Sequence, residues 1–382
     1  MKFRIQHRRY RLPFRVPVRT AHGAWIEREG LIVRLEDEHG VVGFGEAAPI
    51  PHFGTETVDE DEAGVRVLGE WTNEDAMASV PARLAGLRNA IAAARADATV
   101  PTRGTAGGGG ARWRQRAGWG ADAAKPDEDI GLHLSEKDHF GVAALLPAGR
   151  AALAPIAARA ESGFRVFKWK VGVADLADEL VLLDDVCAAL PAGAKLRLDA
   201  NGAWDRRQAE RWLERCAERP VEFLEQPCFA EPTQGAARQR KTEELLLGLA
   251  GDFPTPIALD ESLVGEGDIE RWIGAGWPGV FVVKPSLLGD VRGALVRLEK
   301  AKAAVVFSSA LETGVGAKAA LRTAFQWKGE LDSTGSPQVR ALGFGVWPLF
   351  ADARCDGPYP APFLRREDVE ALKPEAVWNA LS

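Results

Sequence analysis

Cysteine, histidine and long apolar runs are all scarce in this 382-residue sequence. The cysteines are widely separated and form no CxxC pair, which argues against a disulfide framework or a cysteine-rich zinc site. They are Cys187, Cys216, Cys228 and Cys355. No run of 18 uncharged apolar residues occurs, and the basic N-terminal stretch is not followed by an apolar signal core. We therefore expect a cytoplasmic protein that neither spans a membrane nor is exported.

Positive charge is not in excess either. The formal net charge is -6, the isoelectric point lies near 5.7, and no basic stripe occurs. This balance argues against nucleic acid or an anionic membrane as a partner. A hydrophobic content of 46% is ample for sizeable cores. A globular protein that acts on a small molecule is therefore expected.

Residues 1–138 predict an N-terminal capping domain of α+β class. The runs KFRIQHRRYRL, LIVRLED and VVGFGEAAP are typical of strands and suggest an antiparallel sheet, with RTAHGAWIEREG as a loop between the first two. The following VPARLAGLRNAIAAARA has helical spacing. Residues 101–128 are rich in Gly, Ala, Arg and Asp without any period, and we expect a flexible insertion there.

Residues 139–350 predict a (β/α)7β barrel of the TIM type. Short apolar runs alternate with amphipathic segments, which implies a parallel sheet, and this many units favour a closed barrel over an open doubly wound sheet. The apolar runs are GVAALLPAG, RVFKWKVGV, KLRLDANG, VEFLEQP, PIALDES, GVFVVKPS and AVVFSSALETG, with LGFGVWPLF as a candidate last strand. Residues 351–382 are expected to return to the cap.

Polar residues stand at the ends of successive predicted barrel strands, where catalytic groups of such barrels gather. In chain order they are Lys168 and Lys170, Asp199 and Asn201, Glu225, Asp260 and Glu261, and Lys284. A single Asp or Asn after a strand is often only a turn or a helix cap. Several charges in one barrel mouth, however, would each cost on the order of several kcal/mol to desolvate unless paired or bound to a metal.

The residue types at these strand ends suggest metal-assisted proton abstraction. Three carboxylates from three strands suit Mg²⁺ or Mn²⁺, and no histidine stands at a clear strand end to favour zinc. A metal that holds a substrate carboxylate can stabilise an enediolate. A lysine can remove the α-proton if a neighbouring ammonium and the cation lower its pKa. Lys168 and Lys170 fall on one face of their strand and supply that neighbour.

These motifs resemble the enolase superfamily, and its muconate-lactonizing subgroup in particular. KWK matches the subgroup's K-x-K, LDANGAW its D-x-N, EFLEQP its E-Q-P, ALDES its D-E-S and VVKPS its sixth-strand lysine. The resemblance implies that Mg²⁺, with Mn²⁺ as the alternative ion, is bound by Asp199, Glu225 and Asp260. It also implies that Lys170 is the base and then the acid, that Lys284 supports the enediolate from the opposite face, and that Lys168 tunes Lys170 or contacts the carboxylate.

The segments LLPAG, VKPSLLG and SSALETGVG are similar to those of a dehydratase, a carbon–oxygen lyase of menaquinone or phylloquinone biosynthesis. The implied reaction is syn-dehydration of 2-succinyl-6-hydroxy-2,4-cyclohexadiene-1-carboxylate to 2-succinylbenzoate. An N-acylamino acid racemase or a dipeptide epimerase would use the same lysines. Dipeptide epimerases typically carry D-x-D at the eighth strand, whereas LGFGVWPLF has no acid; the racemase stays open.

Two further alternatives lie outside this resemblance. A Schiff-base aldolase would use a barrel lysine, but it would not need three carboxylates. A catalytically silent binding protein would tolerate loss of the lysines and acids, all of which are present.

Substrate contacts are expected from two cap loops and from the seventh strand. TAHGAW and APIPHFG resemble the superfamily's cap loops that close over the site, and their glycines permit movement. In SSALETGVGAKA the serines can donate hydrogen bonds, and the following helix N-terminus could hold the succinyl carboxylate. The candidate substrate-binding residues are Asn201, Ser308, Ser309, Gly314, Thr20 and His22.

Overall fold

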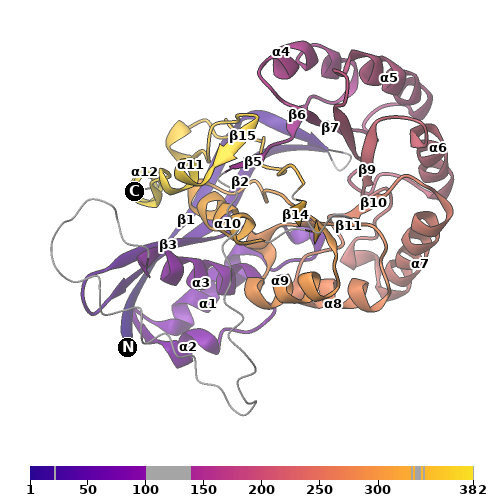
Figure 1. Ribbon diagram of the computed structural model, residues 1–382. Helices are drawn as coiled ribbons and strands as arrows, with labels where there is room; N and C mark the ends of the chain where they lie inside the picture. The colour runs from indigo at the N-terminus through magenta and orange to yellow at the C-terminus, as the bar shows by residue number, and fades with distance from the viewer. Residues whose placement is uncertain (21–22, 100–138, 328–329, 332–336, 339, 382) are drawn as a thin grey trace.

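The computed structural model describes residues 1–20, 23–99, 139–327, 330–331, 337–338 and 340–381. They form a region with an antiparallel sheet and a region with a curved parallel sheet (Figure 1). The predicted insertion at 101–128 lies outside the described residues.

The N-terminal region is a four-stranded antiparallel sheet in the order β3-β2-β1-β4. Its strands are β1 (Lys2–Thr20), β2 (Gly23–Asp37), β3 (Val42–Ala47) and β4 (Trp71–Asn73). The helices of this region are α1 (Val58–Leu68), α2 (Glu74–Ala78) and α3 (Ala85–Thr99). Alternate strand residues such as Ile5, Leu31 and Val33 pack against Leu87 and Ile91 of α3 in one apolar core.

The prediction of a loop at RTAHGAWIEREG is wrong for most of this segment. β1 and β2 pair continuously from Phe3 with Asp37 to Pro13 with Glu27, and again from Val18 with Trp25 to Thr20 with Gly23. The segment pairs because it continues the antiparallel ladder of β1 and β2, whose register shifts between Pro13 and Val18.

The barrel sheet has seven parallel strands in sequence order. They are β6 (Ala144–Leu146), β7 (Val166–Lys170), β8 (Lys195–Asp199), β9 (Val221–Glu225), β10 (Ile257–Leu259), β11 (Val280–Val283) and β12 (Ala304–Phe307). The intervening helices are α4 (Ile156–Glu161), α5 (Leu176–Ala189), α6 (Arg206–Cys216), α7 (Ala236–Asp252), α8 (Glu266–Gly274), α9 (Val291–Lys300) and α10 (Gly314–Gln326). Figure 1 shows α4 to α9 outside the curved sheet, which agrees with the predicted fold class.

The expected last strand at 342–350 is reduced to three isolated bridges, one of which joins Phe350 to Phe14 of β1. Leu342 bridges to Val142, and Gly343 bridges to Ser308, which brings the two edges of the sheet together. The segment forms no longer strand because Gly343 and Gly345 offer no side chain to pack and Pro348 has no amide hydrogen. A Cβ on Gly345 would lie 2.3 Å from the carbonyl oxygen of Ala143, so glycine permits this close approach.

Short elements complete the fold. They are the 3-10 turns η1 (Pro51–Phe53), η3 (Gly149–Leu153), η4 (Pro232–Gln234), η5 (Pro285–Leu287) and η6 (Ala353–Cys355), the strands β5 (His139–Gly141), β13 (Glu330–Leu331), β14 (Pro337–Gln338) and β15 (Phe363–Arg365), and the helices α11 (Arg366–Glu370) and α12 (Pro374–Ala380). β5 pairs with β15 rather than with the barrel sheet.

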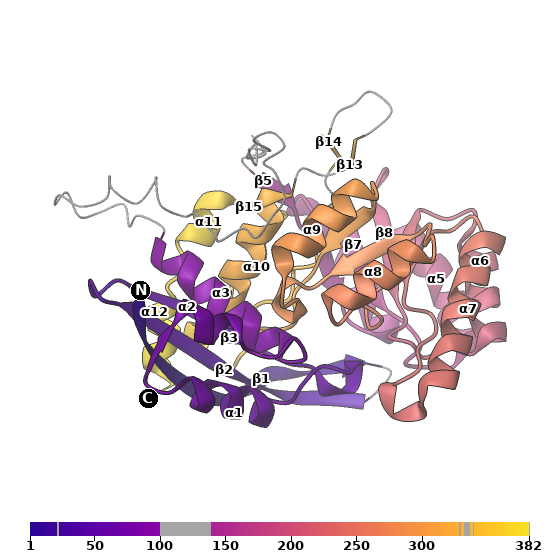
Figure 2. The same ribbon diagram turned by 90° about the horizontal axis from the view of Figure 1, so that it is seen from below.

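The C-terminal segment contacts the cap. Trp378 of α12 packs against Phe44 and lies under the guanidinium of Arg8, 4.2 Å from its ring centroid. Both chain ends lie on the cap side in Figures 1 and 2. The domain limits at 138 and 350 stay a prediction.

Candidate active site

The two lysines of β7 point away from the apolar packing of their strand. Phe167 and Trp169 are fully buried in the main core, whereas Lys168 and Lys170 alternate to the other face. Lys170 is in register with Asp199 of β8. The Nζ atoms of Lys168 and Lys170 lie 2.9 Å and 3.2 Å from the same oxygen, Oδ2 of Asp199. The two half-buried ammonium groups are therefore held side by side by one carboxylate.

A second carboxylate completes this cluster from the next strand. Glu225 ends β9, and its Oε1 accepts a hydrogen bond of 2.6 Å from Lys168 Nζ. Burial lowers the pKa of Lys168, but the charges of Asp199 and Glu225 outweigh it and raise the pKa. Burial likewise opposes ionisation of Asp199, but the two lysines hold its pKa below its usual range. Lys168 and Asp199 are thus fixed as an ion pair.

Asn201 connects Lys170 to Glu261, a predicted strand-end acid to which no role was assigned. Lys170 Nζ donates to Asn201 Oδ1 at 2.8 Å, and Asn201 Nδ2 donates to Glu261 Oε1 at 2.9 Å. Glu261 is 1% exposed, and its Oε2 has no partner within the described residues. Burial and the charge of Asp199 raise the pKa of Glu261 to about 8. Asn201 therefore contacts Lys170 directly, and its role as a substrate ligand stays a prediction.

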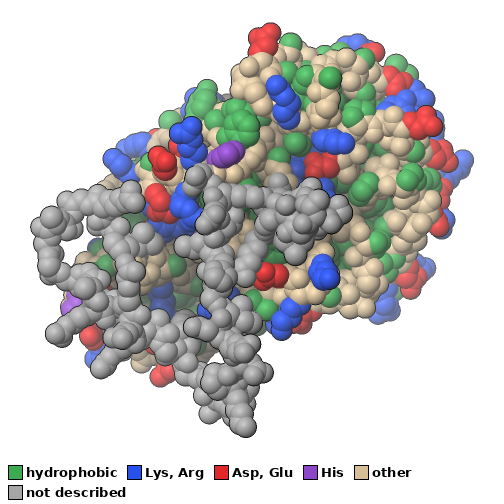
Figure 3. Space-filling model, in the orientation of Figure 1, with side chains coloured by type: hydrophobic (Ala, Val, Ile, Leu, Met, Phe, Trp, Pro, Cys, Tyr) green, Lys and Arg blue, Asp and Glu red, His purple; other side chains and the backbone are tan. Residues whose placement is uncertain are grey.

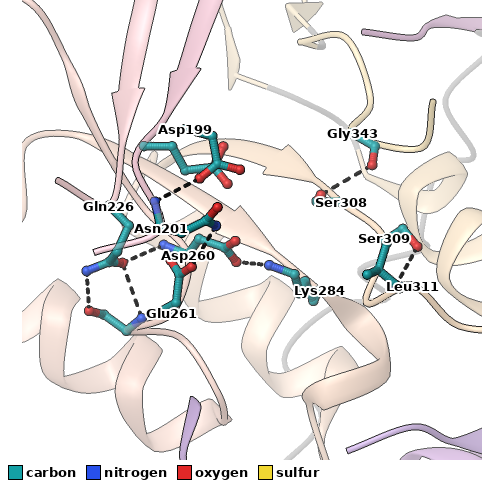
Figure 4. Close-up of polar contacts among 12 residues, drawn as sticks. Asp199, Asn201, Gln226, Asp260, Glu261, Lys284, Ser308, Ser309, Leu311 and Gly343 are labelled. Carbon is teal, nitrogen blue, oxygen red and sulfur yellow. Dashed lines mark hydrogen bonds and ion pairs between the residues drawn. The ribbon is translucent and has the colours of Figure 1, made fainter. Parts of the chain in front are cut away.

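Gln226 fixes the end of β10, a function that the sequence reasoning missed although the E-Q-P motif contains it. Its Oε1 accepts from the amides of Asp260 at 2.9 Å and Ser262 at 3.3 Å. Figure 4 shows these contacts beside Asn201 and Glu261. Asn201 and Gln226 have backbone φ values of 45° and 37°, which residues other than glycine rarely adopt. Such backbone strain often occurs at functional sites.

Lys284 approaches the same region from β11, across the sheet from β7, with β8, β9 and β10 between them. It forms an ion pair with Asp260 and lies 5.4 Å from the ring centroid of Phe53 in the cap. Burial lowers the pKa of Lys284 to about 7, against the opposing charge of Glu225. In Figure 4 Lys284 lies between Asp260 and the two serines after β12. The structure thus brings the predicted lysines and carboxylates into one region.

The carboxylates of the three predicted metal ligands form ion pairs with the lysines. Among the residues with described positions, no three acidic, histidine or cysteine side chains form a ready metal cage. The donor chemistry nevertheless fits a hard divalent cation, because Asp199, Glu225 and Asp260 are buried carboxylates that end adjacent strands. Burial, and after it the charges of Asp199 and Glu225, raise the pKa of the neighbouring Glu261.

The predicted substrate-binding residues have mixed placements. Ser308 Oγ donates to the carbonyl oxygen of Gly343 at 3.3 Å, and Ser309 Oγ donates to Glu312 at 3.0 Å. Thr20 ends β1, where its hydroxyl donates to the carbonyl oxygen of Gly23 at 3.3 Å. Gly314 approaches the C-terminal segment, since a Cβ there would lie 2.7 Å from the carbonyl oxygen of Asp356. His22 lies outside the described residues.

Basic and acidic side chains are mixed on the part of the surface that Figure 3 leaves uncovered.

No helix within the described ranges is long and apolar enough to cross a bilayer.

The curved parallel sheet with lysines and carboxylates at its strand ends defines an enolase-type barrel. A family model described as "Enolase C-terminal domain-like" matches residues 152–338, and one described as "MenC, N-terminal domain" matches residues 3–94. An L-Ala-D/L-Glu epimerase structure from Bacillus subtilis, 19% identical, has a TM-score of 0.72 and covers 95% of each chain. At that identity the likeness shows the fold alone.

Two curated relatives define the family more narrowly. The o-succinylbenzoate synthase of Thermosynechococcus vestitus is 36% identical over 90% of this chain and 92% of its own length. That of Edwardsiella ictaluri is 29% identical over 81% and 82%. A solved o-succinylbenzoate synthase from Thermosynechococcus elongatus BP-1, described as complexed with Mg in the active site, is 34% identical, has a TM-score of 0.70 and covers 99% of both chains. The chain belongs to the o-succinylbenzoate synthase family of the enolase superfamily, which confirms the resemblance.

Proposed function

We propose that this chain catalyses the Mg²⁺-dependent syn-dehydration of 2-succinyl-6-hydroxy-2,4-cyclohexadiene-1-carboxylate to 2-succinylbenzoate. The observation that carries the proposal is the shared oxygen of Asp199, which holds Lys168 and Lys170 together across the barrel from Lys284. Family membership at 36% identity over most of both chains supports the same reaction.

Lys170 performs both proton transfers in this proposal. As the neutral amine it takes the proton from ring carbon 1, which leaves an enediolate on the substrate carboxylate. As the ammonium it returns that proton to the hydroxyl on carbon 6, which departs as water. The ring becomes aromatic, and no proton is gained or lost overall. Asn201 Oδ1, 2.8 Å from Lys170 Nζ, orients the amine.

The other charged residues have two roles, which are to bind the metal ion and to stabilise the enediolate. Asp199, Glu225 and Asp260 would hold Mg²⁺, which would supply positive charge to stabilise negative charge on the substrate carboxylate. Lys284 supports the enediolate from the far side, and its protonated form is the active one for this purpose. Lys168, which the flanking carboxylates keep charged, places a fixed positive charge beside Lys170.

The test is an assay of the purified protein with Mg²⁺ on the cyclohexadiene substrate. We expect 2-succinylbenzoate to form at a rate typical of an enzyme, about 1 s⁻¹ or more. Absence of that product from a folded, metal-loaded sample would overturn the proposal.

A second candidate is racemisation of N-succinylamino acids. A lysine on each side of the site, on β7 and β11, is what two-sided proton transfer requires. Incubation with an N-succinylamino acid in D₂O reports this activity as loss of the α-proton signal. We expect dehydration to be the faster reaction, and racemisation that is far faster would favour the second candidate.

We also propose that the enzyme acts on a small carboxylate in the cytoplasm. Its four cysteines are free in the structure, which suits a reducing compartment.

A further inference from the structure

Glu46, on β3 of the cap, is a buried carboxylate that the proposed chemistry does not use. It is 1% exposed. Its oxygens accept hydrogen bonds from the amides of Thr313, at 2.9 and 3.1 Å, and Gly316, at 2.8 Å. They also accept from the hydroxyls of Thr313 and Tyr10. Four donors from both regions of the protein thus converge on one side chain.

Small residues make room for this arrangement. A Cβ on Gly316 would lie 3.0 Å from Glu46 Oε2, and a Cβ on Gly30 would lie 2.3 Å from the hydroxyl oxygen of Tyr10. The first turn of α10 was expected to hold a substrate carboxylate. Its amides at Thr313 and Gly316 instead bind the carboxylate of the cap, which occupies the favourable position at a helix N-terminus.

The barrel segment that Glu46 holds contains the candidate substrate-binding serines. Ser309 Oγ accepts from the amide of Leu311 at 2.9 Å and donates to Glu312, the residue just before Thr313. Leu311 has a φ of 60°, so this turn needs support from its surroundings. The contact to Thr313 fixes the end of that turn.

The cap loop at 48–54 rests on the same segment. Ile50 and Phe53 form one buried cluster with Ala310 and Leu287. Arg28 holds the start of the loop, because its guanidinium donates to the carbonyl oxygens of Ala48 and of Pro49, the latter at 2.8 Å. Glu46 lies two residues before this loop. Glu46 therefore joins the start of the 48–54 cap loop to the 308–313 turn of the barrel, which carries the two serines.

We propose that Glu46 is a positioning residue that sets substrate affinity by holding the 48–54 cap loop and the 308–313 turn in register. The inference rests on the proposed function, because it concerns the site where that substrate binds. Loss of the contact lets the loop and turn separate, which weakens binding of the ground state and the transition state together. Proton transfer by Lys170 is unaffected, since no described contact joins Glu46 to that lysine.

The test compares Glu46→Gln with wild type in the dehydration assay. We expect KM to rise about tenfold while kcat changes less than about threefold, since a charged hydrogen-bond acceptor is lost without change to the reacting groups. Thr313→Val removes a donor of the same contact and also the N-cap of α10, because Thr313 Oγ1 accepts from the amide of Val315 at 3.2 Å, so it should raise KM and lower Tm as well. The matched control is Glu29→Gln, a cap carboxylate that pairs with Arg11 at the surface, and it should behave as wild type.

Hydrogen exchange at residues 308–316 provides a measurement that does not depend on activity. In Glu46→Gln these amides should exchange faster, while those of β8 do not change. If wild type makes no product, the proposed function fails and exchange alone decides the present inference. An unchanged KM with only a lower Tm, or unchanged exchange at 308–316, overturns it. Tyr10→Phe, which removes a single donor, gives a smaller effect of the same kind and serves if Glu46→Gln does not fold.

Discussion

The barrel buries a cluster of charge at each end, and the two clusters are built differently. At the carboxyl ends of the strands, two lysines share one oxygen of Asp199. At the opposite end, Arg197 lies only two residues earlier on β8. Its Nε lies 2.7 Å from Glu222 Oε2, and its Nη1 donates to the carbonyl oxygen of Ala341 at 2.8 Å. Arg340 binds the other oxygen of Glu222 at 3.0 Å.

The two clusters also differ in the pKa values of their side chains. Burial opposes ionisation of Glu222, but Arg197 and Arg340 outweigh it and lower its pKa, so the group stays charged. At the other end, burial lowers the pKa of Lys284 to about 7 and raises that of Glu261 to about 8. Groups that can change protonation near neutral pH suit proton transfer, whereas fixed ion pairs suit structure. The first cluster thus contains groups that can titrate near neutral pH, whereas the second is a set of fixed ion pairs that joins β8 to β9 and to Ala341.

The largest expected effect is the loss of activity when the metal is removed. Treatment with a chelator should reduce activity to background, and added Mg²⁺ or Mn²⁺ should restore it, because we propose that Asp199, Glu225 and Asp260 hold an ion that stabilises the enediolate. Activity is measured by product formation, with Tm as the control for folding. Full turnover in metal-free buffer would contradict this role for the carboxylates.

Lys284→Ala should reduce kcat by about 10²-fold, the typical effect of removing one preorganised group that stabilises charge. The variant loses the charge opposite Lys170 but retains the proton-transfer group. Steady-state kinetics measure the loss. A kcat within twofold of wild type would remove Lys284 from the mechanism.

Glu222→Gln near the start of β9 should lower stability and leave the chemistry intact. We expect a loss of about 2–4 kcal/mol in the free energy of unfolding, since Arg197 is left as an uncompensated buried charge. The measurement is urea unfolding, together with kcat below the unfolding transition. The exposed Glu214→Gln is the matched control. A tenfold fall in kcat without loss of stability would break the comparison.

The smallest effect is expected in the cap, where Asp61 of α1 is fully buried. Burial and the charge of Glu56 raise the pKa of Asp61 to about 9. Between its ordinary value and pH 9 the folded state keeps a proton that the unfolded chain has lost, so stability from this group falls as pH rises.

Asp61→Asn should therefore stabilise the protein by about 1–2 kcal/mol at pH 8 and by less at pH 4. Urea unfolding at both values measures this, with the exposed Asp75→Asn as the control. An equal change at the two pH values would show that Asp61 is not protonated in the folded protein.

The strand-end residues could be predicted because their spacing follows from local rules. Lys168 and Lys170 differ by two positions and so share a face, and parallel strands bring their carboxyl ends to one edge. The same rules placed Asp199, Glu225 and Asp260 in sequence order around the sheet.

The contact between Glu46 and Thr313 could not be predicted in this way. The two residues are separated by 267 positions, and no repeat or spacing relates a cap strand to a barrel helix. Likewise, local turn signals in RTAHGAWIEREG did not reveal that cross-strand pairing continues to Thr20 and Gly23. Packing between distant segments decided both features.

The most direct test of the account is the kcat of Lys170→Ala, measured beside Lys195→Ala at the exposed start of β8. The account predicts that Lys170→Ala folds normally and loses at least about 10³-fold in kcat, because one group serves as both base and acid. Lys195→Ala should retain wild-type activity. A Lys170→Ala enzyme within tenfold of wild type would contradict the claim that proton transfer occurs at this end of the barrel.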